Sequence, residues 1–244
     1  MADEYTNRIV VIPGGAGGAG ERVSLRWLAA GASVLVVSHG EPSLSQLRAA
    51  WESFAKSDPR RLKTLAADVT TEAGAREMIA AVQSSFGRPP DTLIHMVGGF
   101  SMAAVEAPDT TAVWDRMMKM NVLSNLMCYR AALPAMRARG GGWIVGIGAR
   151  SAIHPGAQIS AYAASKAALV ALTQSLSAEV KSQNIHVNLI LTSVIDTPAN
   201  RKAMGDKNAG KWVKPDDIAD ATMYLCSDAA RAVHGATLEV YGEA

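Results

Sequence analysis

Cysteines and aromatic residues are scarce in this sequence. Aromatic side chains make up 5% of its 244 residues, and it has two cysteines, Cys128 and Cys226. Both cysteines lie in apolar, helix-like segments without C-x-x-C spacing, so the sequence predicts neither a disulfide framework nor a metal site. We expect two reduced core thiols, which suit a reducing compartment such as the cytoplasm.

Blocks of positive charge and long apolar runs are also missing. The 24 lysines and arginines, against 22 aspartates and glutamates, form no cluster that would indicate a nucleic-acid partner. The start, Met1 to Arg8, is polar, and no later apolar run is long enough to cross a bilayer. The sequence therefore predicts a cytoplasmic protein with neither a membrane nor a nucleic-acid partner.

Apolar residues, at 49% of the chain, are plentiful enough to bury one substantial core. Short β-rich runs alternate with longer helical patterns. The expected strands cover residues 8–13, 33–38, 62–67, 92–97, 143–148, 185–191 and 237–242. The expected helices lie near residues 19–30, 43–57, 72–86, 110–138, 160–183 and 215–227.

Most of these strands are apolar with little alternation, which is typical of parallel strands covered on both faces. Strand–helix alternation indicates βαβ units with right-handed crossovers. No repeat or long linker divides the chain, so we expect residues 1–244 to form a single α/β domain. Its expected fold is a doubly wound, Rossmann-like parallel sheet of about seven strands with helices on both faces. The polar segment 197–215 is expected to be a substrate flap.

The first expected strand runs directly into a glycine-rich turn, "PGGAGGAG" at residues 13–20. Glycine permits a sharp turn and close approach of the backbone to a pyrophosphate, and the following helix N-terminus presents free N–H groups. A glycine cluster alone is weak, but its strand–turn–helix context predicts a dinucleotide site. The expected contacts are Gly14, Gly15, Gly18, Ala19 and Gly20.

The end of the second strand carries Ser38 and His39 where an acid would bond the adenosine ribose and favour NAD. Without a carboxylate to repel a 2′-phosphate, the sequence slightly favours NADP over NAD, although Ser38 and His39 could simply end a surface strand. Asp68 and Val69 follow the third strand, where the carboxylate of Asp68 could contact an adenine amino group. Asp68 could equally well cap the loop ahead of the next helix.

Tyr162 and Lys166 lie four residues apart on an expected helix, so both side chains project from the same face. A nearby ammonium group stabilises a phenolate and would lower the tyrosine pKa from about 10. Such a tyrosine can exchange a proton with a carbonyl or alcohol oxygen while hydride moves to or from a nicotinamide.

With these motifs the chain resembles the short-chain dehydrogenases/reductases over nearly its whole length. The resemblance lies in "PGGAGGAG", "ADVT", "VGG" (97–99), "MNV", "YAASK", "VNLILTSVIDTP" and "GATLEV". It implies that Asn121 holds a water joining Lys166 to solvent, and that Lys166 bonds the nicotinamide ribose. By the same resemblance Gly98 and Gly99 border the cofactor, and Thr197 contacts its carboxamide.

The chain departs from the family at several places. The usual N-N-A-G stretch is replaced by residues 95–98, "HMVG", and the usual Pro-Gly after the sixth strand is Thr192-Ser193. The family serine that polarises the substrate oxygen aligns with Ala149. The catalytic set is therefore Asn121, Tyr162 and Lys166 without that serine.

One branch of the family, the dihydropteridine reductases, shares this deficit. The chain is similar to it in "VGGF", in "GAR" at 148–150 and in "DTPANRKAM…KW" at 196–212. A quinonoid pterin is already easily reduced, so it would tolerate losing a donor that commonly contributes about 3–4 kcal/mol to the transition state. The branch, however, uses NADH through an aspartate where this chain has Ser38.

Two residues near Ala149 are alternative helpers. Ser151 would face the same side as Ala149 if the strand continued, but it would then lie roughly 6.6 Å further along. Arg150 could bind an anionic or heteroaromatic substrate, or it could be an ordinary surface arginine. The expected pocket wall is apolar and aromatic, suits a flat ring-containing substrate, and comprises Phe100, Met102, His154, Met204 and Trp212.

The leading hypothesis is an NAD(P)H-dependent oxidoreductase with Tyr162 as proton donor, acting on an activated acceptor such as a quinonoid pterin. The alternatives are a non-catalytic NAD(P)-binding regulatory or scaffold protein, and an alcohol dehydrogenase that uses Ser151. Helices 110–138 and 160–183 carry apolar residues on more than one face. The family commonly pairs these helices, which implies a homodimer or homotetramer.

Overall fold

Strands and helices alternate along the computed structural model, which describes residues 5–54 and 58–243. The strands are β1 (Ile9–Pro13), β2 (Ser33–Ser38), β3 (Leu62–Ala66), β4 (Thr92–His95), β5 (Gly142–Ala149), β6 (Ile185–Thr192) and β7 (Thr237–Val240). The α-helices are α1 (Gly18–Ala29), α2 (Glu41–Glu52), α3 (Glu72–Phe86), α4 (Thr110–Met118), α5 (Ser124–Ala138), α6 (Ser160–Val180), α7 (Pro198–Met204) and α8 (Pro215–Leu225).

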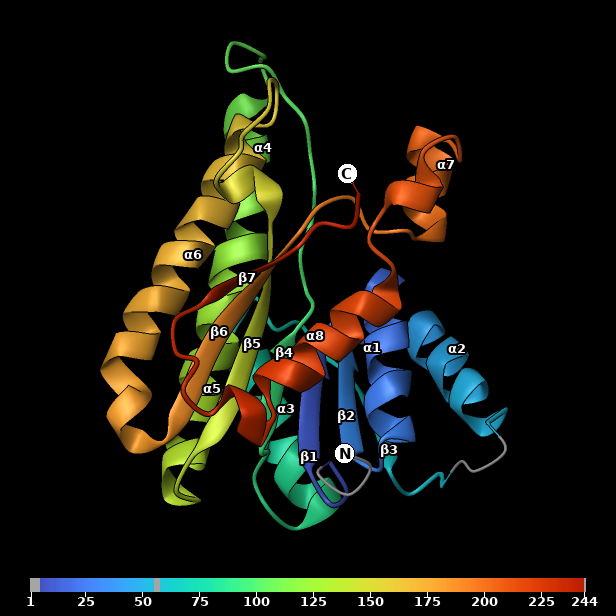
Figure 1. Ribbon diagram of the computed structural model, residues 1–244, viewed down its shortest axis with the longest axis vertical. Helices are drawn as coiled ribbons and strands as arrows, with labels where there is room; N and C mark the ends of the chain where they lie inside the picture. Colours follow the sequence, from blue (N-terminus) through green and yellow to red (C-terminus); the bar gives the residue numbers. More distant parts are fainter. Residues whose placement is uncertain (1–4, 55–57, 244) are drawn as a thin grey trace.

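The seven strands form one sheet in the order β3-β2-β1-β4-β5-β6-β7, and every neighbouring pair is parallel (Figure 1). The predicted doubly wound α/β fold is confirmed. After β3 the chain returns to the other side of β1, so the winding direction reverses between β1 and β4. In open parallel sheets, ligands bind at the carboxyl ends of the strands beside such a reversal.

Each face of the sheet has its own apolar core. Val10 and Ile12 of β1 pack with α1, α2 and α8, whereas Ile9 and Val11 pack with α3, α5 and α6. Figure 1 shows the helices on both sides of the sheet. This alternation follows from the two-residue side-chain period of a strand, and burial on both faces explains the uniformly apolar strands. Within the described ranges, every helix is too short or too polar to cross a membrane.

Two expected helices have different limits in the structure. The helix expected at 43–57 is α2, which ends at Glu52, and residues 55–57 lie outside the described residues. The helix expected at 110–138 is divided into α4 and α5 by a π-helical turn, Lys119–Leu123. A π turn contains one extra residue per turn and is frequent at functional sites.

The segment expected to be a flap, residues 197–215, is held at both ends. Thr197 caps α7 by accepting a 3.2 Å hydrogen bond from the Asn200 N–H, and the Asp196 N–H donates to the Val213 carbonyl at 2.8 Å. Between these anchors α7 is exposed and stands away from the sheet (Figure 1). Trp212 was expected to line the pocket, but it is 6% exposed and packs inside the molecule.

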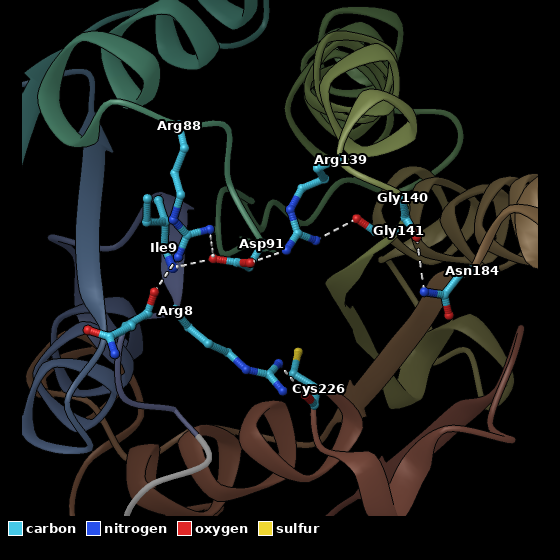
Figure 2. Close-up of polar contacts among 10 residues, drawn as sticks. Arg8, Ile9, Arg88, Asp91, Arg139, Gly140, Gly141, Asn184 and Cys226 are labelled. Atoms are coloured by element: carbon cyan, nitrogen blue, oxygen red, sulfur yellow. Dashed lines mark hydrogen bonds and ion pairs between the residues drawn. The ribbon is translucent and has the colours of Figure 1, made fainter.

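A carboxylate at the amino ends of β1 and β4 joins several segments of the chain (Figure 2). Asp91 is 6% exposed and accepts hydrogen bonds from the Ile9 N–H at 2.6 Å and from Arg88 at 2.8 Å. Arg139, which follows α5, forms the third contact to Asp91 and also donates to the Gly141 carbonyl at 2.6 Å. This cluster fixes the start of the sheet, at the end opposite the expected ligand crevice.

Replacing Asp91 with asparagine should destabilise the fold. Removing one member of a buried ion pair leaves its partners without a counter-charge, which costs about 3 kcal/mol of unfolding free energy. Urea unfolding at neutral pH would measure the change. Asp220→Asn is a matched control, because its ion pair with Arg26 is solvent-exposed and contributes about 0.5 kcal/mol at most. Equal stability of the two variants would contradict a structural role for Asp91.

Candidate active site

A cavity of about 610 Å³ lies at the carboxyl ends of the strands, beside the reversal between β1 and β4. Nine of the residues expected to bind the cofactor line it: Gly14, Gly18, Ala19, Gly20, Ser38, His39, Asp68, Val69 and Gly98. Five others lie outside its lining: Gly15, Gly99, Thr197, Tyr162 and Lys166. The residues that line the cavity extend from Ser38, at the end of β2, to Ile147, near the end of β5.

The glycine-rich turn forms one wall of this cavity through its backbone. Gly14 and Gly18 have positive φ angles of 80° and 46°, which side chains disfavour. A Cβ atom on Gly14 would lie 2.6 Å from the Val97 nitrogen, and one on Gly20 would lie 2.2 Å from the Gly14 oxygen. The bare backbone and the N-terminus of α1 therefore fit the diphosphate of a dinucleotide.

Gly15 serves packing under the turn. Its carbonyl accepts a 2.8 Å hydrogen bond from Ser24, and a Cβ atom here would lie 2.6 Å from the same hydroxyl. The absence of a side chain lets α1 pack closely against β1. Only the structure distinguishes this glycine from those that face the cavity.

The far end of the cavity, at the ends of β2 and β3, carries mixed charge. Asp68 accepts from the hydroxyl and N–H of Thr70 at 2.6 and 2.9 Å, and these bonds, with nearby Lys119 and His39, lower the pKa of its carboxyl. Thr71, and not Asp68, caps α3. Thr70 and Lys119 also line the cavity and were not among the residues predicted from the sequence. The π-helical turn that carries Lys119 has no periodic signature to reveal it.

Ser38 ends β2 beside a second hydroxyl. Its Oγ atom lies 3.0 Å from Ser43 Oγ, and Ser43 also donates to the Gly40 carbonyl at 2.9 Å. Ser38 and His39 line the cavity at the end of β2. The cavity therefore has hydroxyls and an imidazole at the place where an acid would bond the adenosine ribose.

At the other end, Asn121 joins the loop after β4 to α6. Its side chain accepts from the Gly99 N–H at 2.8 Å and donates to the Gly99 carbonyl at 3.1 Å and to Ser165 at 2.9 Å. Asn121 is fully buried within the π-helical turn, and its own carbonyl accepts from Asn125 at 2.9 Å. These bonds fix the backbone of the loop that borders the cavity.

Lys166 lies beside Asn121 and is 5% exposed. Its Nζ atom donates to the Ile147 carbonyl of β5 at 2.8 Å and would lie 3.4 Å from a Cβ atom on Gly98. Burial destabilises the ammonium form and lowers the pKa of Lys166 to about 8. The amine therefore remains largely protonated at neutral pH, next to the cavity.

Tyr162 projects beside Lys166 as expected, with 5.9 Å from Nζ to the centre of the ring. The predicted lowering of its pKa is wrong in this structure, because burial raises the pKa of Tyr162 to about 12. A contact with the Ser151 hydroxyl acts in the opposite direction but is weaker. The loss of water around the buried phenol outweighs the charge of Lys166, and a helix-spacing pattern does not reveal that burial.

Several apolar side chains in the segments that follow β4, β5 and β6 are exposed to solvent. Phe100 packs edge-on against the Tyr162 ring, with 4.9 Å between ring centres. Phe100, Met102, Ile153 and Met204 are 58%, 56%, 46% and 60% exposed. A bridge between Ala103 and Ile159 ties the loop after β4 to the loop before α6.

Other candidates take no direct part in the cavity. His95, which begins the unusual "HMVG" stretch, is buried against Tyr129, and burial lowers its pKa to about 3, so it is neutral. Arg150 is exposed, with its guanidinium 5.5 Å from the centre of the Tyr241 ring. The described residues contain no group of three or more His, Cys, Asp or Glu side chains able to hold a metal.

Comparisons with known proteins agree with this architecture. Residues 14–242 match the family model described as enoyl-(acyl carrier protein) reductase. The chain is 28% identical to 2-(S)-hydroxypropyl-CoM dehydrogenase 3 from Xanthobacter autotrophicus, over 99% of this chain and 98% of that protein.

Solved structures give the same result. A short-chain type dehydrogenase/reductase from Mycobacterium ulcerans superposes with a TM-score of 0.89 at 25% identity, over 98% of this chain and 90% of the other. L-Sorbose reductase from Gluconobacter frateurii, complexed with NADPH and L-sorbose, gives 0.86 at 26% identity, over 99% and 98%. The chain therefore belongs to the short-chain dehydrogenases/reductases, a family of NAD(P)-dependent oxidoreductases.

Proposed function

We propose that the protein is a carbonyl-type reductase in which Tyr162 gives a proton to the substrate oxygen. The observation that carries this proposal is that buried Lys166 bonds the carbonyl of Ile147, a residue that lines the glycine-walled cavity, and that Tyr162 lies one helical turn before Lys166. Reduced nicotinamide, when bound, supplies the hydride. Lys166 and Asn121 hold the loop and strand that border the nicotinamide end.

Burial favours reduction over alcohol oxidation at this site. With a pKa raised to about 12, the phenol of Tyr162 carries its proton at neutral pH and is ready to donate it. A carbonyl oxygen that receives electrons becomes strongly basic, so proton transfer from a phenol is favourable. The ammonium group of Lys166 stabilises the phenolate that remains.

Tyr162→Phe should reduce kcat/KM by about 10²–10⁴-fold, the usual contribution of a general acid. Turnover would be measured with NADPH and NADH on quinonoid dihydropterin, a quinone and a panel of ketones. Tyr224→Phe is the matched control, since Tyr224 is 46% exposed on α8. Coenzyme binding by the wild type without turnover of any acceptor would instead favour a non-catalytic NAD(P)-binding protein.

The proposed coenzyme is NADPH, with NADH as the weaker alternative. The end of β2 bears no carboxylate to repel a 2′-phosphate, and Ser38 and His39 line the cavity there. Similar solved structures are complexed with NADPH or with NADH, so the preference rests on the end of β2. Asp68 follows β3 and accepts a hydrogen bond from the Thr70 hydroxyl. Its carboxyl group stays anionic, which suits a contact to the adenine amino group.

Ser38→Asp should reverse this preference. A carboxylate at the end of β2 would accept bonds from the ribose hydroxyls and repel a 2′-phosphate, so NADPH affinity should fall at least about tenfold, or ~1.4 kcal/mol. Nicotinamide fluorescence titration with both coenzymes measures the ratio of dissociation constants. Ser45→Asp, on the exposed side of α2, controls for added negative charge. An unchanged ratio in Ser38→Asp would refute the proposed preference.

The proposed substrate is an activated carbonyl or imine-like heterocycle, with a quinonoid pterin as the named candidate. Ala149 leaves the end of β5 without a hydroxyl, so easily reduced acceptors fit better than plain ketones. The exposed ring of Phe100 packs against Tyr162 and suits a flat, apolar substrate, and Met102 and Met204 are further exposed apolar side chains in the segments after β4 and β6. The exposed helix α7, within the expected flap, lies among the segments that would contact such a ring.

The proposed assembly is a homodimer or homotetramer. A groove of about 400 Å³ between α5 and α6 has apolar walls that include Leu126, Leu133 and Leu172, with Arg137 and Glu179 on its rim. Opposite charges on one surface allow a two-fold copy to pair with itself. The free, buried thiols Cys128 and Cys226 suit the proposed cytoplasmic location.

Leu126→Glu should convert the assembly to a smaller species, because Leu126 is 40% exposed and a buried charge in the interface is unfavourable. Size-exclusion chromatography with light scattering would measure the mass. Val105→Glu is the control, because Val105 is 75% exposed and does not line the groove. A wild-type mass equal to one chain would rule the assembly out.

A further inference from the structure

The glycine-walled cavity is lined by few ionisable side chains. Of the described residues that line it, three carry such groups: His39, Asp68 and Lys119. An imidazole titrates near neutral pH, and the carboxylate of Asp68 is anionic and accepts a 2.6 Å hydrogen bond from the Thr70 hydroxyl. The ammonium group of Lys119 is therefore the one permanent cation among these lining residues.

The π-helical turn explains how Lys119 reaches the cavity. Lys119 is the first residue of this turn and is exposed. Asn121, two residues later, is buried and holds the Gly99 backbone of the loop after β4. The same turn is thus anchored in the fold on one side and presents a lysine to the cavity on the other.

The end of the cavity that contains Lys119 is also the end beside Ser38. The Ala67 N–H donates to the Ser38 carbonyl at 3.1 Å, so the residue after Ala67, Asp68, lies next to the end of β2. Lys119 is close enough to Asp68 for its charge to act on that carboxyl group, as does His39. Lys119 therefore faces the region where the adenosine ribose is expected.

Arg48, on α2, is a second cation near the same edge of the sheet, but its side chain is already bonded elsewhere. It donates to Thr64 of β3 at 2.7 Å and to Ser45 at 2.8 Å, and it forms an ion pair with Glu41. Arg48 is also outside the cavity lining. A phosphate could recruit Arg48 only by breaking these bonds, whereas Lys119 already lines the cavity.

We propose that Lys119 provides the positive charge for the 2′-phosphate of NADPH and is a residue that determines the coenzyme preference. This inference rests on the preference for NADPH proposed above. A phosphate monoester carries about 1.5 to 2 negative charges at neutral pH, whereas the 2′-hydroxyl of NADH carries none. Asp68 is anionic at the same end of the cavity, so a cation is needed to offset its repulsion of the phosphate.

Lys119→Met should weaken NADPH binding about tenfold and leave the dissociation constant of NADH within about twofold of the wild type. Methionine keeps most of the apolar stem and removes the charge. Lys119→Arg keeps the charge and should keep the affinity for NADPH. Lys181→Met, at an exposed lysine after α6 and outside the cavity lining, controls for the loss of one surface charge. Nicotinamide fluorescence titration gives both dissociation constants.

A second measurement uses ligands that lack nicotinamide. 2′,5′-ADP carries the 2′-phosphate and 5′-AMP does not, so calorimetric titration with both isolates the contribution of this group. Lys119→Met should lose affinity for 2′,5′-ADP and keep its affinity for 5′-AMP. Added salt should weaken 2′,5′-ADP binding more in the wild type than in Lys119→Met, because salt screens the attraction between charges.

The outcomes separate this inference from the proposal on which it rests. If the wild type binds NADH more tightly than NADPH, the proposed coenzyme preference is wrong, and the role of Lys119 falls with it. If the wild type prefers NADPH but Lys119→Met weakens both coenzymes equally, or neither of them, only the inference about Lys119 is overturned.

Discussion

The hydrogen bond from Lys166 to the Ile147 carbonyl is the contact on which the geometry of the site depends. A buried ammonium group needs an acceptor, because an unpaired charge away from water is strongly unfavourable. The 2.8 Å bond therefore holds α6 against the end of β5. Tyr162, one helical turn before Lys166, is placed beside the same strand end. Asn121 completes the arrangement by bonding both the loop after β4 and Ser165 of α6.

Burial changes the pKa values of Tyr162 and Lys166 in opposite directions. It raises the pKa of Tyr162 to about 12 and lowers the pKa of Lys166 to about 8, since each neutral form is favoured away from water. At neutral pH the phenol still holds its proton, and most of the amine is still charged. A protonated phenol beside a cation is the state from which a reductase would begin its reaction.

Much of the scaffold could be predicted because local chemistry determines it. Uniformly apolar strands indicated a sheet covered on both faces, and the glycine-rich turn indicated a backbone-walled cavity. The features that could not be predicted depend on tertiary packing. The π-helical turn at Lys119–Leu123 and the 3₁₀ turn at Arg150–Ala152 have no sequence periodicity of their own, and the inward packing of Trp212 depends on residues far away in the chain.

The two halves of the site are built from different kinds of backbone. The half beside the glycine-rich turn lies on strand ends and a helix N-terminus, where a Cβ atom on Gly14 or Gly20 would collide with other main-chain atoms. The half beside Tyr162 is made by loops, held together by the bridge between Ala103 and Ile159. Side chains on those loops can change without moving the sheet. The shape of this half can therefore vary while Tyr162 and Lys166 stay where α6 holds them.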